Sequence, residues 1–220
     1  MDKKEKTLPV IAIDGPVASG KGTLARRLAA TINFAYLDTG SLYRAVASLI
    51  LERGSDPNDS VVAAKVADSF TADDINRSDL RDEKVGQAAS IVAANQEVRK
   101  SLLEFQRNFA KAPPNNHLGA VLDGRDIGTV VCPDAEIKLF ISATPEVRAK
   151  RRHKELLDRG DESIYARVLE DLRERDERDR NRATAPLRAA EDAVTLDTSD
   201  MDADKAFEVA KSLVSERLSL

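Results

Sequence analysis

Cysteine and histidine are scarce in this chain: Cys132 is the only cysteine, and His117 and His153 are the only histidines. A single thiol cannot form an intramolecular disulfide or a zinc site of several cysteines, and it suits a reducing compartment. Neither histidine has a partner at ligand spacing, so histidine metal sites and Ser-His-Asp catalysis are not indicated. We expect Cys132 to be a small buried group that follows a strand.

The chain also lacks long apolar runs and an excess of basic charge. No stretch approaches the roughly 18 apolar residues of a membrane span, and the N-terminal segment MDKKEKTLP has no apolar core of a signal peptide. The formal net charge of −4 gives little support for binding a nucleic-acid backbone. We therefore expect a cytoplasmic protein whose partners are small molecules, with no nucleic acid and no membrane among them.

Short apolar runs rich in β-branched residues are present, and longer helical patterns separate them. Runs without polar alternation are typical of strands covered on both faces, and strands that alternate with helices form parallel sheets. The five runs span residues 10–13, 34–37, 120–122, 137–141 and 194–196. We predict an α/β fold with a five-stranded parallel sheet.

Four of these runs are followed by aspartate, namely Asp14, Asp38, Asp123 and Asp197. Ligands of open α/β sheets lie at the carboxyl ends of the strands, so this acidic edge is the expected place of a site. A turn or helix cap is the alternative role for each aspartate.

A chain of 220 residues is long enough for one domain with insertions. We predict a core of residues 1–40, 112–147 and 183–220. Residues 41–111 have helical patterns, with one helix closed by Gly54 and a break near Asn95. A crossover between strands needs only one helix, so these residues are expected to form an inserted lobe. The highly charged residues 148–182 are expected to form a lid.

The segment IDGPVASGKGTLARRLA places a G-x-x-x-x-G-K loop between a predicted strand and a predicted helix. This context favours a phosphate-binding loop, because the backbone N–H groups and the helix N-terminus can face a phosphate. The expected ATP-binding residues are Gly15, Pro16, Val17, Ala18, Ser19, Gly20, Lys21, Gly22 and Thr23. Lys21 is expected to lie over the β- and γ-phosphates. Glycine follows Lys21 where Ser or Thr is usual, so we assign the hydroxyl near Mg²⁺ to Thr23.

Asp123 ends a predicted strand, where a carboxylate can orient Mg²⁺-bound water. We therefore expect Thr23 and Asp123 to serve the metal ion, with Asp123 acting through water. A helix or turn cap is the alternative for Asp123.

Four motifs, DGPVASGKGT, LDTGSLYR, DGRDIGTVV and ERDERDRNR, occur in the order found in bacterial cytidylate kinases. The chain resembles that family over almost its entire length, and its GKGT loop is similar to that of nucleoside monophosphate kinases. Adenylate kinase would have a DGFPR-like stretch in place of DGRDIG. The resemblance implies an adenylate-kinase-like core with an inserted acceptor-binding lobe and a short lid. It also implies a monomer that transfers the γ-phosphoryl of ATP to CMP or dCMP.

The resemblance further implies which residues bind the acceptor. Those expected around its phosphate are Thr39, Tyr43, Arg44, Arg125 and Arg175. Those expected at the cytosine edge are Ser90, Arg99 and Asp126, and those expected at the sugar are Asp179 and Arg182. A carboxylate at Asp126 complements the cytosine amino group but faces a carbonyl in uracil, which disfavours UMP. A local salt bridge is the alternative for Arg125 and Asp126.

The motif ERDERDRNR places Arg175, Arg178 and Arg182 at i, i+3 and i+7, with Asp179 on the same helical stripe. One face of such a helix can contact a phosphate and a sugar while the opposite face remains in water. A fully solvated helix face is the alternative, because alternating charges are typical of one.

The segment EVRAKRRHK places Arg148, Arg151 and Arg152 on one helical stripe. A lid could use them to neutralise the charge on the transferring phosphoryl group, and nucleic-acid binding is the alternative. Together with Lys21, Arg125 and Arg175, these three arginines are the expected catalytic residues.

Two features depart from the family pattern. LDTG replaces the frequent LDSG and keeps the hydroxyl, whereas residues 69–84 are too short and too polar for the small β-sheet that many members carry. The acceptor lobe is therefore expected to be trimmed. The alternative functions are a P-loop kinase for another nucleotide or a phosphate-free metabolite, and an ATP-dependent switch or RNA-binding accessory factor. The acceptor-side arginines argue against a neutral acceptor.

Overall fold

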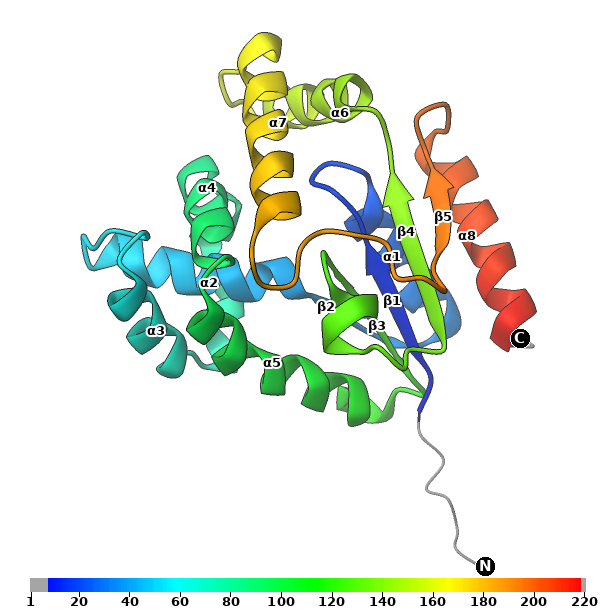
Figure 1. The fold of residues 1–220 in the computed structure, drawn as a ribbon. Coiled ribbons are helices and arrows are strands. Elements are labelled where there is room, and N and C mark those ends of the chain that lie inside the picture. Colours follow the sequence, from blue (N-terminus) through cyan, green and yellow to red (C-terminus); the bar gives the residue numbers. More distant parts are fainter. Residues whose placement is uncertain (1–7, 219–220) are drawn as a thin grey trace, which may run out of the picture.

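Five parallel strands form a sheet with helices on both faces in the computed structural model, which describes residues 8–218 (Figure 1). The strands are β1 (Val10–Asp14), β2 (Ala35–Asp38), β3 (Ala120–Gly124), β4 (Ile137–Ser142) and β5 (Val194–Asp197). They lie in the order β2-β3-β1-β4-β5, and every neighbouring pair is parallel. The predicted fold class and all five predicted strands are confirmed.

The register brings acidic residues together at one edge of the sheet. Asp38 on β2 lies opposite Asp123 on β3, and Asp14 on β1 lies opposite Gly124. This edge is the carboxyl end of every strand because all the strands run in the same direction. The predicted acidic edge is therefore present.

Alternating side chains of the strands fill two apolar layers. Ile11 and Ile13 pack on one face with α1 (Lys21–Ile32) and α8 (Ala203–Leu218). Ala12 and Leu122 face the other side, toward α5 (Gln96–Lys111). Most side chains in the two layers are buried. This burial fixes the strand register, because a shift by one residue would move each side chain to the opposite face.

The prediction that every strand is covered on both faces is wrong for β5. Val194 is 46% exposed, whereas Leu196 is buried. β5 lies at the edge of the sheet, so fewer helices reach it.

The inserted segment forms a helical lobe at one side of the sheet (Figure 1). Its helices are α2 (Thr39–Glu52), α3 (Ser60–Asp68), α4 (Glu83–Val92) and α5, which share an apolar cluster of their own. The break near Asn95 is confirmed, since the Oδ1 of Asn95 accepts hydrogen bonds from Glu97 N at 2.9 Å and Val98 N at 3.3 Å. Between α3 and α4 the chain makes two 3₁₀ turns, η1 (Ala72–Asn76) and η2 (Ser78–Arg81), and no strand.

Two helices, α6 (Pro145–Asp158) and α7 (Tyr165–Asn181), stand beyond the carboxyl ends of the strands (Figure 1). Thr144 caps α6 by accepting a hydrogen bond from Val147 N. The remaining short elements are η3 (Pro114–Asn116) and a π-helical turn, η4 (Ile127–Val131). Among residues 8–218, no helix combines the length and the apolar character that crossing a membrane requires.

Candidate active site

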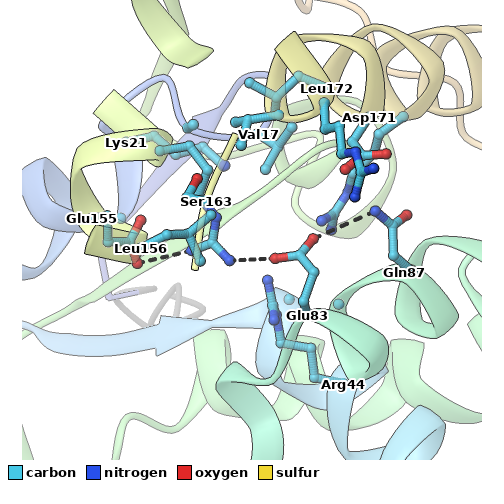
Figure 2. Close-up of a pocket in the computed structure, with 18 of the residues that line it drawn as sticks. Val17, Lys21, Arg44, Glu83, Gln87, Glu155, Leu156, Ser163, Asp171 and Leu172 are labelled. Atoms are coloured by element: carbon cyan, nitrogen blue, oxygen red, sulfur yellow. Dashed lines mark hydrogen bonds and ion pairs between the residues drawn. The ribbon is translucent and has the colours of Figure 1, made fainter. Parts of the chain in front are cut away.

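Two cavities open at the carboxyl edge of the sheet, and the glycine loop borders both. The first cavity has a volume of about 490 Å³ and lies between this loop, α2, α4, α6 and α7 (Figure 2). The second cavity has a volume of about 600 Å³ and is bordered by α1, α6 and the segment that follows β5. Lys21, Gly22 and Asp38 line both of them, so the two cavities meet at the glycine loop.

The glycine loop is packed tightly against the sheet. A Cβ atom at Gly15 would lie 2.1 Å from the carbonyl oxygen of Ile141 on β4, so only glycine fits there. Gly20 has a φ of 89°, a left-handed conformation that favours glycine, immediately before α1. Lys21 begins α1 and donates from Nζ to Pro16 O at 3.3 Å. The lysine side chain therefore folds back over the loop.

The glycine at position 22 has a structural reason. A Cβ atom there would lie 3.3 Å from Oδ2 of Asp123 and 3.8 Å from Oη of Tyr36. A serine or threonine in this place would crowd the carboxylate that ends β3. Thr23 is exposed and lines the second cavity, whereas Asp123 lines the first.

Cationic side chains from five different segments converge on the first cavity. They are Lys21 of α1, Arg44 of α2, Arg125 after β3, Arg152 of α6, and Arg167 and Arg175 of α7. Figure 2 shows Lys21 and Arg44 on opposite sides of this space. Glu83 of α4 accepts a hydrogen bond there from Arg152 of α6. Guanidinium groups bind phosphates through paired N–H donors, so the cavity suits an anionic phosphate ligand.

Arg175 has a buried donor that an anionic ligand could satisfy. Its Nε is buried and has no hydrogen-bond partner within residues 8–218. Burial and the neighbouring charge of Arg125 lower the pKa of Arg175 to about 9. A buried donor without a partner destabilises the fold, and a phosphate oxygen would satisfy it.

Two carboxylates face the first cavity beside these cations. Burial and the charge of Asp38 raise the pKa of Asp123, and Lys21 opposes this effect. The Oη of Tyr36 also donates a hydrogen bond to Asp123 at 3.1 Å. A divalent cation would relieve the repulsion between Asp38 and Asp123, so this pair fits Mg²⁺. Within residues 8–218 no three His, Cys, Asp or Glu side chains are grouped to hold a metal, which leaves phosphate and water as the further ligands.

The residues expected at the cytosine edge form a buried polar cluster. Asp126 pairs with Arg99, and its Oδ1 accepts a second hydrogen bond from Arg182 at 3.4 Å. The guanidinium of Arg99 lies 5.6 Å from the ring centre of Tyr43. The Oγ of Ser90 is buried without a partner in the described part of the chain. Tyr43, Arg99, Asp126 and Arg182 thus come together from α2, α5, the segment after β3 and the residue that follows α7.

Only part of the expected acceptor set borders the first cavity directly. Arg44, Arg125 and Arg175 line it. Thr39 is instead buried, and its Oγ1 donates to the carbonyl oxygen of Asp123 at 2.8 Å. Asp179 is also buried and accepts from Arg125.

The three arginines expected in the lid occupy different surroundings. Arg152 lines both cavities and forms ion pairs with Glu83 at 2.6 Å and Glu155 at 3.0 Å. Arg151 lines the second cavity and donates to Thr198 O at 2.6 Å.

Arg148 borders neither cavity, and its side chain is 1% exposed. Its guanidinium contacts Asp176 at 2.5 Å and Val17 O of the glycine loop at 3.1 Å. The expected stripe on α6 is therefore divided among two cavities and one buried ion pair.

The expected helical stripe on α7 is wrong at its end. The helix stops at Asn181, and Arg182 has extended backbone angles, with φ −62° and ψ 138°. Arg182 meets Asp126 because the chain has left the helix, and not because of a seven-residue helical spacing. Arg178, on the helix, donates to Gln87 of α4 at 3.2 Å.

A family comparison decides the classification. The family model described as cytidylate kinase matches residues 11–216. The chain belongs to the cytidylate kinase family. Curated cytidylate kinases from Paramagnetospirillum magneticum and Acidiphilium cryptum are each 56% identical to it, with coverage of 94% and 96% of this chain and 98% and 97% of theirs.

Solved structures support the fold of this cytidylate kinase family member. A sugar kinase from Janibacter matches with a TM-score of 0.51 and 16% identity, over 94% of this chain and 95% of that one. A gluconokinase from Sinorhizobium meliloti matches with a TM-score of 0.50 and 13% identity, over 98% of each chain. At such low identity the likeness concerns the fold alone.

Two contacts of this cytidylate kinase family member could not be predicted from its sequence. Glu83 of α4 pairs with Arg152 of α6 across the first cavity. Asp14, noted only as a residue at the end of a strand, accepts backbone hydrogen bonds from Ile127 and Gly128. The only signal in the sequence was the position of each acidic residue at the start or end of an element.

Proposed function

We propose that this protein transfers the γ-phosphoryl group of ATP to CMP or dCMP and releases ADP with CDP or dCDP. The observation that carries this proposal is the convergence of Lys21, Arg44, Arg125, Arg152 and Arg175 on one cavity beside the glycine loop. One phosphate ligand at the loop and a second at the guanidinium groups would account for this density of positive charge. Membership of the cytidylate kinase family supports the pyrimidine acceptor.

ATP would bind through the loop from Gly15 to Thr23. The backbone N–H groups of this loop and the N-terminus of α1 favour the phosphates, with Lys21 near the β- and γ-phosphates. The second cavity, which Arg151 and Thr198 also line, would hold the rest of the donor.

CMP would bind through the inserted lobe and α7. Thr39, Tyr43, Arg44, Arg125 and Arg175 would surround its phosphate. Ser90, Arg99 and Asp126 would contact cytosine, and Asp179 with Arg182 the sugar. The Oγ of Ser90 and the Nε of Arg175 have no partner in the part of the chain that the structure describes. This supports these assignments, because a bound nucleotide would satisfy both.

Catalysis would rest on positioning and electrostatics, without a protein nucleophile. Lys21, Arg125, Arg152 and Arg175 would stabilise the negative charge spread over the transferring phosphoryl group. Arg151 would act from the side of the donor, and Arg148 would act by holding the glycine loop through Val17 O. The Asp38–Asp123 pair and Thr23 would hold Mg²⁺, which supplies charge neutralisation on the phosphates when bound.

A phosphate oxygen of CMP would form a bond to the γ-phosphorus of ATP. The bond between the γ-phosphorus and the bridging oxygen would break, and that oxygen would leave with ADP. Helices α6 and α7 would shield this step from water, which would otherwise take the phosphoryl group. A monomer is the state that the family resemblance implies.

A coupled assay of ADP release tests the proposed function with CMP, dCMP, UMP, AMP and cytidine as acceptors. We expect saturable turnover with CMP or dCMP, weaker turnover with UMP and none above background with cytidine. Preference for AMP or for a phosphate-free acceptor would assign the fold to another kinase. ADP release that no acceptor stimulates would instead support an ATP-dependent switch.

A further inference from the structure

Asp14 connects the glycine loop to the loop that carries Arg125 and Asp126. It is the last residue of β1 and directly precedes Gly15. Its Oδ1 accepts a hydrogen bond from Ile127 N at 2.8 Å, and its Oδ2 accepts one from Gly128 N at 2.8 Å. The carboxylate is 4% exposed, so these two amides are its main source of stabilisation.

The two amides belong to the first turn of η4, the π-helical turn over Ile127–Val131. The first N–H groups of a helical turn have no partner within the turn, and the preceding side chain commonly accepts their hydrogen bonds. Asp126 is in that preceding position, but its side chain makes no such bond. Its carboxylate pairs instead with Arg99 and Arg182.

Asp14, which lies on β1, therefore caps η4 in place of the residue that directly precedes the turn. Because Asp14 occupies both amides, the Asp126 side chain is free to project toward Arg99 on α5. Gly128 packs beside Asp14: a Cβ atom there would lie 3.5 Å from Oδ2 of Asp14, an ordinary contact distance, and 3.1 Å from the Lys138 side chain.

We propose that Asp14 is a positioning residue for the acceptor site: it caps η4 in place of Asp126 and so directs the Asp126 carboxylate toward the acceptor base. This inference rests on the proposed function, in which Asp126 contacts cytosine. The link also runs from the donor side, since Asp14 adjoins the glycine loop. A side chain without contact to either nucleotide would thus hold the two binding loops in one arrangement.

The variant Asp14→Asn tests this role. Its amide offers one acceptor oxygen and an NH₂ group that cannot accept, so one of the two backbone N–H groups loses its partner. The Asp126 carboxylate is the nearest cap and would turn toward the free amide. We expect the ratio of kcat/KM for CMP to kcat/KM for UMP to fall about tenfold or more, mainly through KM for CMP.

A matched control is Asp197→Asn, because Asp197 ends β5 and, among residues 8–218, its side chain accepts hydrogen bonds only from the nearby Ser199. This variant should keep the wild-type ratio. The double variant Asp14→Asn/Asp126→Asn should discriminate no worse than Asp126→Asn alone, because both changes act through the same carboxylate. A purely structural role of Asp14 would leave the CMP-to-UMP ratio within twofold of wild type, or would give losses that multiply in the double variant. Either result overturns the proposal.

Hydrogen exchange of the wild-type protein gives a readout that needs neither activity nor a folded variant. The amides of Ile127 and Gly128 should be protected to about the same degree as those of β1. Exchange at the rate of an open loop would overturn the cap and the proposal. If wild-type protein does not phosphorylate CMP, the proposed function fails, and protected amides would then show that only the capping contact survives.

Discussion

Arg125 donates its Nε–H to Asp179 at 2.8 Å, although 54 residues separate the two in the sequence. The contact joins the end of β3 to α7. It also engages the carboxylate of Asp179, one helical turn after Arg175, and the Nε of Arg175 has no acceptor within residues 8–218. Arg125 is thus held by the protein, whereas the Nε of Arg175 is left for a ligand.

Replacement of Arg175 by methionine should raise stability and lower activity. The change removes a guanidinium whose Nε is buried without a hydrogen-bond acceptor within residues 8–218, and whose pKa burial lowers to about 9. We expect the free energy of unfolding to rise by about 1–3 kcal/mol and kcat/KM for CMP to fall by about 10²–10³-fold. Urea unfolding and steady-state kinetics measure the two effects.

Arg180→Met is the matched control for this variant, since Arg180 lies on the same helix with a side chain that is 58% exposed. It should change neither quantity appreciably. Normal activity in Arg175→Met would remove this arginine from the proposed site.

Asp126→Asn should reduce the preference for CMP over UMP. An asparagine amide can donate to the uracil carbonyl that the carboxylate repels, so we expect the ratio of kcat/KM values to shrink by about 10–100-fold. Asp134→Asn, at an exposed position shortly after η4, is the control and should keep the ratio. Unchanged selectivity in Asp126→Asn would make Asp126 a structural partner of Arg99 and nothing more.

The position of the loop hydroxyl can be tested with Gly22→Ser, Thr23→Ala and the double variant. A side chain at position 22 would crowd Asp123 at 3.3 Å. We expect Gly22→Ser to lower kcat about tenfold and to fail to restore Thr23→Ala, because a displaced Asp123 cannot serve Mg²⁺. Rates measured over a range of Mg²⁺ concentrations report the effect. A fully active double variant would show that the hydroxyl can occupy either position.

Asp14→Asn should also change the pH dependence of stability. Burial raises the pKa of Asp14 to about 6 from its ordinary 3.8, despite its two backbone hydrogen bonds. The folded state therefore binds this proton more tightly than the unfolded state. The contribution of this proton to the free energy of unfolding is complete below about pH 4 and is lost as the pH rises through about 6.

As the pH rises between those limits, the free energy of unfolding of the wild-type protein should fall by about 3 kcal/mol relative to that of the Asn variant. The titratable groups that face Asp14 are Lys21, Asp126 and Cys132, and both proteins contain them. Urea unfolding of both proteins at a series of pH values gives the difference. A difference that does not vary with pH would contradict the raised pKa.

Most of the fold can be predicted from local patterns in the sequence. The five strands, the glycine loop before α1 and the helix break at Asn95 each follow from a few neighbouring residues. Glycine and Asn act through their own backbone or through amides two or three residues away, so their effects can be predicted without tertiary structure.

Contacts between distant segments could not be predicted in the same way. The pairing of Arg148 with Asp176, of Arg152 with Glu83 and of Asp14 with η4 depends on how helices and strands meet. A charged segment offers many pairings of similar energy, and only the packed structure selects among them. The departure of Arg182 from the α7 stripe has the same origin, because the helix ends one residue before it.

The central claim is that converging guanidinium groups hold the phosphate of a pyrimidine nucleotide. Calorimetric titration of the protein with CMP, and separately with cytidine, tests it most directly. We predict saturable binding of one CMP per chain and an affinity for cytidine lower by at least about 100-fold. Equal affinity for the two compounds, or no saturable binding of CMP, would contradict the claim.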